Sequence, residues 1–98
     1  MTITKNGNRM EASIVGKLDT STSPAFEAEV ARYLDDDTKE IILDLKDSIY
    51  ISSAGLRVIL ALEKKMENVD GSLRIINVPD LIMEVFTETG LSDILTLE

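Results

Sequence analysis

The chain has 98 residues, of which 44% are hydrophobic and 29% are charged, and its formal net charge is −8 at pH 7. This length and composition predict a single soluble domain, residues 1–98, with one modest core. The excess of negative charge argues against nucleic acid and anionic membrane surfaces as partners, because both bind positively charged proteins.

Cysteine and histidine are both absent from the sequence. Without cysteine there is no disulfide or thiolate nucleophile, and without histidine the commonest general base is missing. We therefore expect no catalytic residue, no cofactor and no enzymatic activity. The first residues lack the apolar segment of a signal peptide, and the longest strongly apolar run, residues 58–62, is far shorter than a membrane span of about 20 residues. A cytoplasmic protein without direct membrane insertion is expected.

The first elements are predicted to be a β-hairpin followed by a helix. Residues 2–5 and 10–15 flank Asn6-Gly7, a strong signal for a two-residue turn. Ser23 is predicted to be the N-cap of the helix, because Pro24 follows it at the first helical position. The helix is expected to end in the acidic run of residues 35–37.

The second half of the chain alternates between strands and helices. Residues 40–45 and 73–78 are short apolar runs that predict strands. Between them, apolar residues recur at helical spacing from Gly55 to Val69 and predict a long amphipathic helix. Pro79 opens a last helix, which Gly90 ends, and residues 91–98 are compatible with either a helical turn or a short strand.

The predicted element order is therefore β-β-α-β-α-β-α. A hairpin joined to β-α-β crossovers implies an α/β fold with a mixed sheet of four or five strands. Because such crossovers are right-handed, the helices should lie mainly on one face of the sheet.

Two adjacent serines, Ser52 and Ser53, stand where the long helix begins. A serine at this position is most often an ordinary N-cap. It is alternatively a phosphate acceptor, because unpaired N–H groups and the helix dipole favour an anion there. The small residues Ala54 and Gly55 follow, and Gly55 suggests close packing or access for another molecule.

Several acidic residues are predicted to share one edge of the sheet with this corner. Asp44 lies at the C-terminal end of a strand and Asp19 lies in the loop before the first helix, and such positions gather on one edge of an α/β sheet. The chain has no histidine, and its carboxylates show no recognised ligand spacing. Solvated loop acids are therefore favoured over a metal site.

Five segments resemble the STAS domain of bacterial anti-sigma factor antagonists. They are residues 16–19, 41–45, 50–60, 71–73 and 84–86, the last together with Gly90, so the resemblance covers essentially the whole chain. The most specific segment is the run from Tyr50 to Leu60, Tyr-Ile-Ser-Ser-Ala-Gly-Leu-Arg-Val-Ile-Leu. The resemblance implies a STAS-like mixed sheet with flanking helices.

The resemblance also implies a partner-switching role in transcription regulation. The unphosphorylated protein would bind an anti-sigma factor that is also a serine kinase, and this binding frees a sigma factor. Phosphorylation would end the binding, and a phosphatase would reset the cycle. Aligning Gly55-Leu56 with the family motif places Ser53 at the phosphoacceptor, Ser52 where many members have aspartate, and Ala54 where many have serine or threonine.

The partner is expected to contact the residues around this corner and along the helix that follows it. They are Asp19, Asp44, Ser52, Ala54, Gly55, Leu56, Arg57 and Leu60. A phosphate on Ser53 would place a dianion near Asp19 and Asp44, and a partner would have to desolvate it at a cost of up to several kcal/mol.

The alternative is a constitutive STAS subunit of a larger assembly, for example a transporter-associated one. In that case Ser53 would act only as a cap, and Leu56, Arg57 and Leu60 would form an apolar and cationic contact patch.

Overall fold

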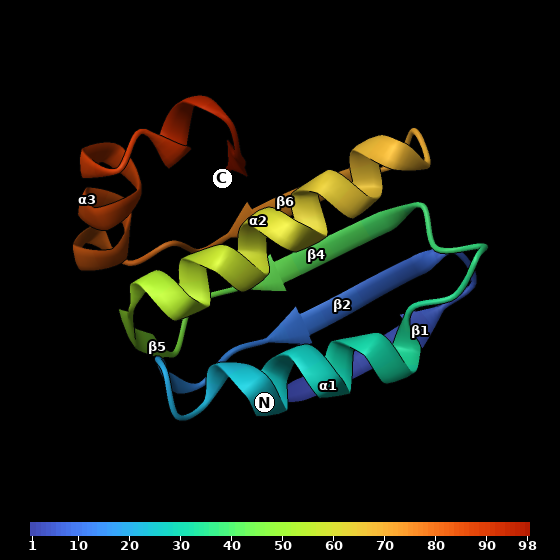
Figure 1. Cartoon of the computed structure of the whole chain (residues 1–98), viewed down its shortest axis with the longest axis horizontal. Helices are drawn as coiled ribbons and strands as arrows, with labels where there is room; N and C mark the ends of the chain where they lie inside the picture. Colours follow the sequence, from blue (N-terminus) through green and yellow to red (C-terminus); the bar gives the residue numbers. More distant parts are fainter.

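The computed structural model describes residues 1–98 and contains a five-stranded mixed sheet (Figure 1). Its strands, in spatial order, are β1 (Thr2–Asn6), β2 (Arg9–Ser13), β4 (Glu40–Asp44), β6 (Ser72–Ile76) and β7 (Thr96–Leu97). Strands β1 and β2 are antiparallel, and the pairs from β2 to β7 are parallel. The predicted mixed sheet is confirmed.

Two helices, α1 (Ser23–Tyr33) and α2 (Ser53–Asn68), lie side by side across one face of this sheet (Figure 1). Helix α3 (Asp80–Glu88) lies beyond one end of the sheet, and the short 3-10 helix η1 (Leu91–Asp93) connects it to β7. The prediction that the helices lie mainly on one face is confirmed. None of these helices combines the length and the hydropathy that crossing a membrane requires.

A single apolar core fills the space between the sheet and the helices. The strands contribute every second residue, as expected for a pleated sheet with one covered face. These core residues include Met10, Ala12, Ile41, Leu43, Leu73 and Ile75. Helix α2 contributes Ile59, Leu62 and Met66 from its buried side.

A second, two-stranded parallel sheet was not predicted. It consists of β3 (Gly16–Leu18) and β5 (Ser48–Ile51). These strands have three and four residues, too few for a periodic hydrophobic pattern. Leu18 and Ile51 are paired in register and buried, and they connect the small sheet to the main core.

The structure corrects the predicted start of α1 and decides the conformation of the C-terminal tail. The N-cap of α1 is Thr22 and not Ser23, which is the first helical residue, with a buried hydroxyl that has no hydrogen-bond partner. The prediction failed because the loop before the helix is organised by Asp19, whose carbonyl accepts from the Ser23 N–H at 2.8 Å. The tail contains both predicted alternatives, since η1 is followed by the edge strand β7.

Candidate functional site

The corner between β5 and α2 is organised by Ser52. This residue has an extended backbone, and its hydroxyl oxygen accepts from the Gly55 N–H at 3.5 Å. Its own N–H donates to the carbonyl of Leu18 at 2.9 Å. Ser52 is thus the N-cap of α2, and it ties the beginning of the helix to strand β3.

Ser53 is the first residue of α2, and its side chain is free. The residue is exposed, and no hydrogen bond within the chain involves its hydroxyl. Because Ser52 already fills the capping position, the interpretation of Ser53 as a cap is wrong. The hydroxyl of Ser53 is accessible to a modifying enzyme, and the nearby backbone N–H groups of the first helical turn favour an anion.

Gly55 allows α2 to approach β3 closely. A Cβ atom at this position would lie 2.7 Å from the carbonyl oxygen of Leu18 and 2.9 Å from Cγ1 of Ile51. Such distances are shorter than van der Waals contact, so any larger residue would push the helix away. The glycine therefore serves close packing of the corner.

Asp19 lies beside this corner. It directly follows Leu18, which pairs with Ile51 at the end of β5. The Asp19 carboxylate accepts from the Ser21 hydroxyl at 2.8 Å and from the N–H groups of Ser21 and Thr22 at 3.0 and 3.1 Å. The Ser21 hydroxyl and these N–H groups hold the pKa of Asp19 below its ordinary value. Asp19 therefore places a fixed negative charge near the beginning of α2.

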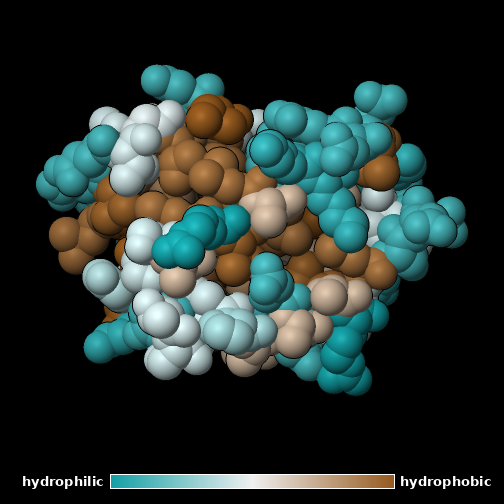
Figure 2. Space-filling model, in the orientation of Figure 1, coloured by the Kyte–Doolittle hydropathy of each residue, from teal (hydrophilic) through white to brown (hydrophobic).

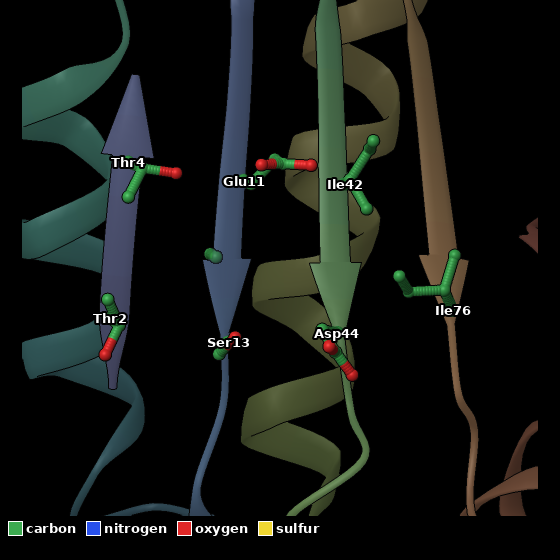
Figure 3. A pocket seen from close by; sticks show the side chains of 8 residues that line it. Thr2, Thr4, Glu11, Ser13, Ile42, Asp44 and Ile76 are labelled. Atoms are coloured by element: carbon green, nitrogen blue, oxygen red, sulfur yellow. The ribbon is translucent and has the colours of Figure 1, made fainter. Parts of the chain in front are cut away.

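The structure does not bring Asp44 together with Ser53. Asp44 lies at the end of β4, and its side chain points to the face of the sheet that the helices leave uncovered (Figure 3). Its Oδ1 accepts from the Lys46 N–H at 2.9 Å and from the Asn77 side chain at 3.1 Å.

The uncovered face around Asp44 has a pocket of about 180 Å³. Its labelled lining residues in Figure 3 are Thr2, Thr4, Glu11, Ser13, Ile42, Asp44 and Ile76. The structure contains no cluster of three or more carboxylates that could hold a metal ion.

The other predicted contact residues on α2 differ in their exposure. Arg57 is exposed and Ala54 and Leu60 are half-buried. Leu56 is only 8% exposed and belongs to the core, so it has little surface to offer a partner. Of these predicted contact residues, Arg57 is therefore the most accessible, and Ala54 and Leu60 offer part of their surface.

An apolar groove between β5 and α3 was missed by the sequence analysis. It has a volume of about 270 Å³. Its apolar residues are Ile49, Tyr50, Ile51, Leu81, Ile82 and Val85, and we call it the β5–α3 groove. Ile49 and Leu81 are 64% and 72% exposed, which is high for large apolar side chains. In Figure 2, hydrophobic surface gathers at the left end of the molecule, where Figure 1 places β5 and α3.

The β5–α3 groove borders the candidate site, since β5 ends at the residue directly before Ser52. Two exposed carboxylates from α3, Glu84 and Glu88, also line it. One signal in the sequence does point to the groove: Leu81 is an apolar residue outside the buried stripe of α3, which is formed by Ile82 and Phe86.

The sequence model of the STAS domain matches residues 1–98, the full length of the chain. The chain belongs to the STAS domain family. BtrV of Bordetella bronchiseptica is 33% identical over 90 residues, which cover 92% of this chain and 78% of that protein. The anti-sigma-B factor antagonist of Bacillus subtilis is 27% identical over 95 residues, covering 97% of this chain and 86% of the relative.

Solved structures share the fold. The anti-sigma factor antagonist SpoIIAA in its unphosphorylated form superimposes with a TM-score of 0.78 at 15% identity, covering 99% of this chain and 86% of SpoIIAA. Its phosphorylated form, from Bacillus, gives a TM-score of 0.77 at 17% identity, covering 99% and 89%. The STAS fold of this chain is therefore similar to both forms of SpoIIAA.

Proposed function

We propose that this protein is an anti-sigma factor antagonist that is controlled by phosphorylation of Ser53. In its unphosphorylated form it binds an anti-sigma factor and so frees a sigma factor for transcription. The observation that carries the proposal is the division of roles between two serines: Ser52 caps α2, whereas Ser53 presents an exposed hydroxyl with no partner. Relatives named anti-sigma factor antagonists align with nearly the whole chain.

The proposed partner surface combines the beginning of α2 with the β5–α3 groove. The groove offers the exposed apolar side chains Ile49 and Leu81. Glu84 and Glu88 line the groove, and Asp19 adds a negative charge beside the beginning of α2. A complementary partner surface would insert an apolar side chain and surround it with lysine or arginine residues.

Phosphorylation acts on the binding surface and leaves the fold unchanged in this proposal. A phosphate adds a charge of about −1.5 to −2 and three strong acceptors. At the first residue of α2 it meets the positive end of the helix dipole, which stabilises an anion by typically about 0.3–1 kcal/mol. The similarity of this fold to both forms of SpoIIAA supports this part of the proposal.

A bound partner would instead have to desolvate the phosphate. The phosphate would lie at the same corner as Asp19, whose carboxylate stays ionised, because Leu18 before Asp19 is hydrogen-bonded to Ser52 before Ser53. The corner would then carry two anions. Desolvation of such charges costs several kcal/mol, which corresponds to a loss of affinity of orders of magnitude.

The proposed kinase is the anti-sigma factor itself, which transfers the terminal phosphoryl group of ATP to the Ser53 oxygen. A phosphatase removes the group and restores binding. In this scheme a general base of the kinase accepts the proton of the Ser53 hydroxyl, and ADP is the leaving group.

The test is incubation of the purified protein with the cognate anti-sigma kinase and ATP, followed by intact-mass measurement. We expect one added phosphate in the wild-type protein and in Ser52→Ala, and none in Ser53→Ala. Labelling that persists in Ser53→Ala would overturn the site assignment. Partner affinity that is the same for Ser53→Asp and wild type would instead favour the constitutive STAS subunit.

A further inference from the structure

Arg57 is the one arginine of this chain that has no carboxylate partner. The sequence contains four arginines. Arg9 pairs with Glu11 and Glu40, Arg32 pairs with Glu29, and Arg74 pairs with Glu40 and Glu98. Arg57 is exposed on α2 and forms no ion pair. Its free guanidinium is therefore available to an anion that the unmodified chain lacks.

The sequence around Arg57 explains why its guanidinium is free. On a helix, the side chains within reach are those three and four residues away. For Arg57 these positions hold Ser53, Ala54, Leu60 and Ala61, and none of them is acidic. The only one of these four side chains that can acquire a negative charge is Ser53, through phosphorylation.

We propose that the guanidinium of Arg57 binds the phosphate when Ser53 is phosphorylated. This inference rests on the proposed function and adds a role for a residue of the same chain. Ser53 and Arg57 are four residues apart in α2, one helical turn, with the anion on the N-terminal side. This order is the more favourable one for an ion pair on a helix, and guanidinium and phosphate form strong charge-assisted hydrogen bonds.

Binding of Arg57 to the phosphate changes the charge of the surface that the partner contacts. In the unphosphorylated protein the guanidinium lies on the accessible surface of α2 beside Leu60, where it offers a donor to an acidic group of the partner. In the phosphorylated protein the same guanidinium is held by the phosphate of its own chain. Phosphorylation thus adds a negative charge and also removes a positive contact from the surface.

The test uses phosphoserine incorporated at position 53 during synthesis, so it does not depend on any kinase. The second pKa of the phosphate is measured by ³¹P NMR titration in four proteins: the unsubstituted chain, Arg57→Gln, Arg57→Lys and Lys64→Gln. Lys64 is an exposed cation farther along α2 and serves as the matched control. Circular dichroism checks that each variant is folded.

We expect the phosphate pKa in the unsubstituted chain to be lower than in Arg57→Gln by roughly 0.15–0.4 of a pH unit, because Arg57 favours the dianion. In Arg57→Lys the phosphate pKa should stay close to that of the unsubstituted chain, and in Lys64→Gln it should equal it. An identical titration in the unsubstituted chain and Arg57→Gln would overturn the inference. Because the phosphate is installed directly, that result would leave the proposed kinase reaction and its test unaffected.

Discussion

The carbonyl oxygen of Leu18 accepts a hydrogen bond of 2.9 Å from the N–H of Ser52. This bond joins the last residue of β3 to the N-cap of α2, and it holds the beginning of the helix against the small sheet. The same carbonyl lies 2.7 Å from the position that a Cβ of residue 55 would occupy. One backbone oxygen therefore determines both the position of the cap and the need for a glycine after it.

Gly55→Ala is expected to destabilise the protein. The added methyl group would overlap the Leu18 carbonyl, and relief of such overpacking typically costs about 1–3 kcal/mol. Urea denaturation measures the free energy of unfolding. Ala61→Ser, which adds one atom at an exposed position of the same helix, should change it by less than about 0.5 kcal/mol. Equal stability of the two variants would contradict the close approach of α2 to β3.

The two serines at the corner should differ in their effect on stability. Ser52→Ala removes the N-cap, and such a loss costs about 0.5–2 kcal/mol; the lower part of this range is expected because the bond to Gly55 is 3.5 Å long. Ser53→Ala removes a hydroxyl without a partner and should change stability by less than about 0.5 kcal/mol. The measurement is again urea denaturation, and a larger loss for Ser53→Ala than for Ser52→Ala would reverse the assigned roles.

Ile49→Asp is expected to weaken binding of the anti-sigma factor while the fold is retained. Ile49 is 64% exposed in the β5–α3 groove, so a charge there costs the free protein little but must be desolvated in the complex. We expect at least a tenfold loss of affinity by calorimetry. Tyr33→Ser at the far end of α1 changes a partly exposed aromatic residue outside this groove and should leave affinity unchanged. Similar losses in both variants would argue against the groove as the binding surface.

Glu63 should make the protein less stable as the pH rises. Burial, together with the nearby charge of Glu67, raises the pKa of Glu63, and one of its carboxylate oxygens is buried without a hydrogen-bond partner. Between the unfolded and folded pKa values the folded state binds more protons, so stability falls as the pH rises through that window and stays lower above it.

Glu63→Gln removes this dependence. The variant is therefore expected to have a higher urea midpoint than wild type at pH 7, with a smaller difference at pH 4. Glu27→Gln, at an exposed position of α1, controls for the loss of one negative charge. A Glu63→Gln effect that is the same at both pH values would show that burial of the charged carboxylate is not its cause.

The main sheet and the helices could be predicted from the sequence because their patterns are long enough to be periodic. The buried stripe of α2 extends from Gly55 to Met66, and β4 is an unbroken apolar run from Ile41 to Leu43 between acidic ends. Strands β3 and β5 have no such pattern, because tertiary pairing between Leu18 and Ile51 determines them. For this reason the small sheet was found only in the structure.

The candidate site was predicted in part. The motif correctly placed two serines at the beginning of α2, and Ser52 proved to be the cap. The prediction that Asp44 lies together with Ser53 was wrong. Its position at the end of a strand indicates the edge of the sheet where Asp44 lies, but the alternation of side chains along β4 determines the face to which it points. The exposed apolar residue Leu81 is a local signal for one wall of the β5–α3 groove, but its pairing with Ile49, which is distant in the sequence, comes from the tertiary structure.

The most direct test of the central claim is the affinity of the anti-sigma factor for this protein with and without a phosphate on Ser53. Calorimetry with the unmodified protein and with phosphoserine incorporated at position 53 gives both dissociation constants. We predict tight binding of the unmodified protein and an affinity at least about 100-fold lower for the phosphorylated one, which corresponds to roughly 3 kcal/mol. Equal affinities for the two forms would contradict the account.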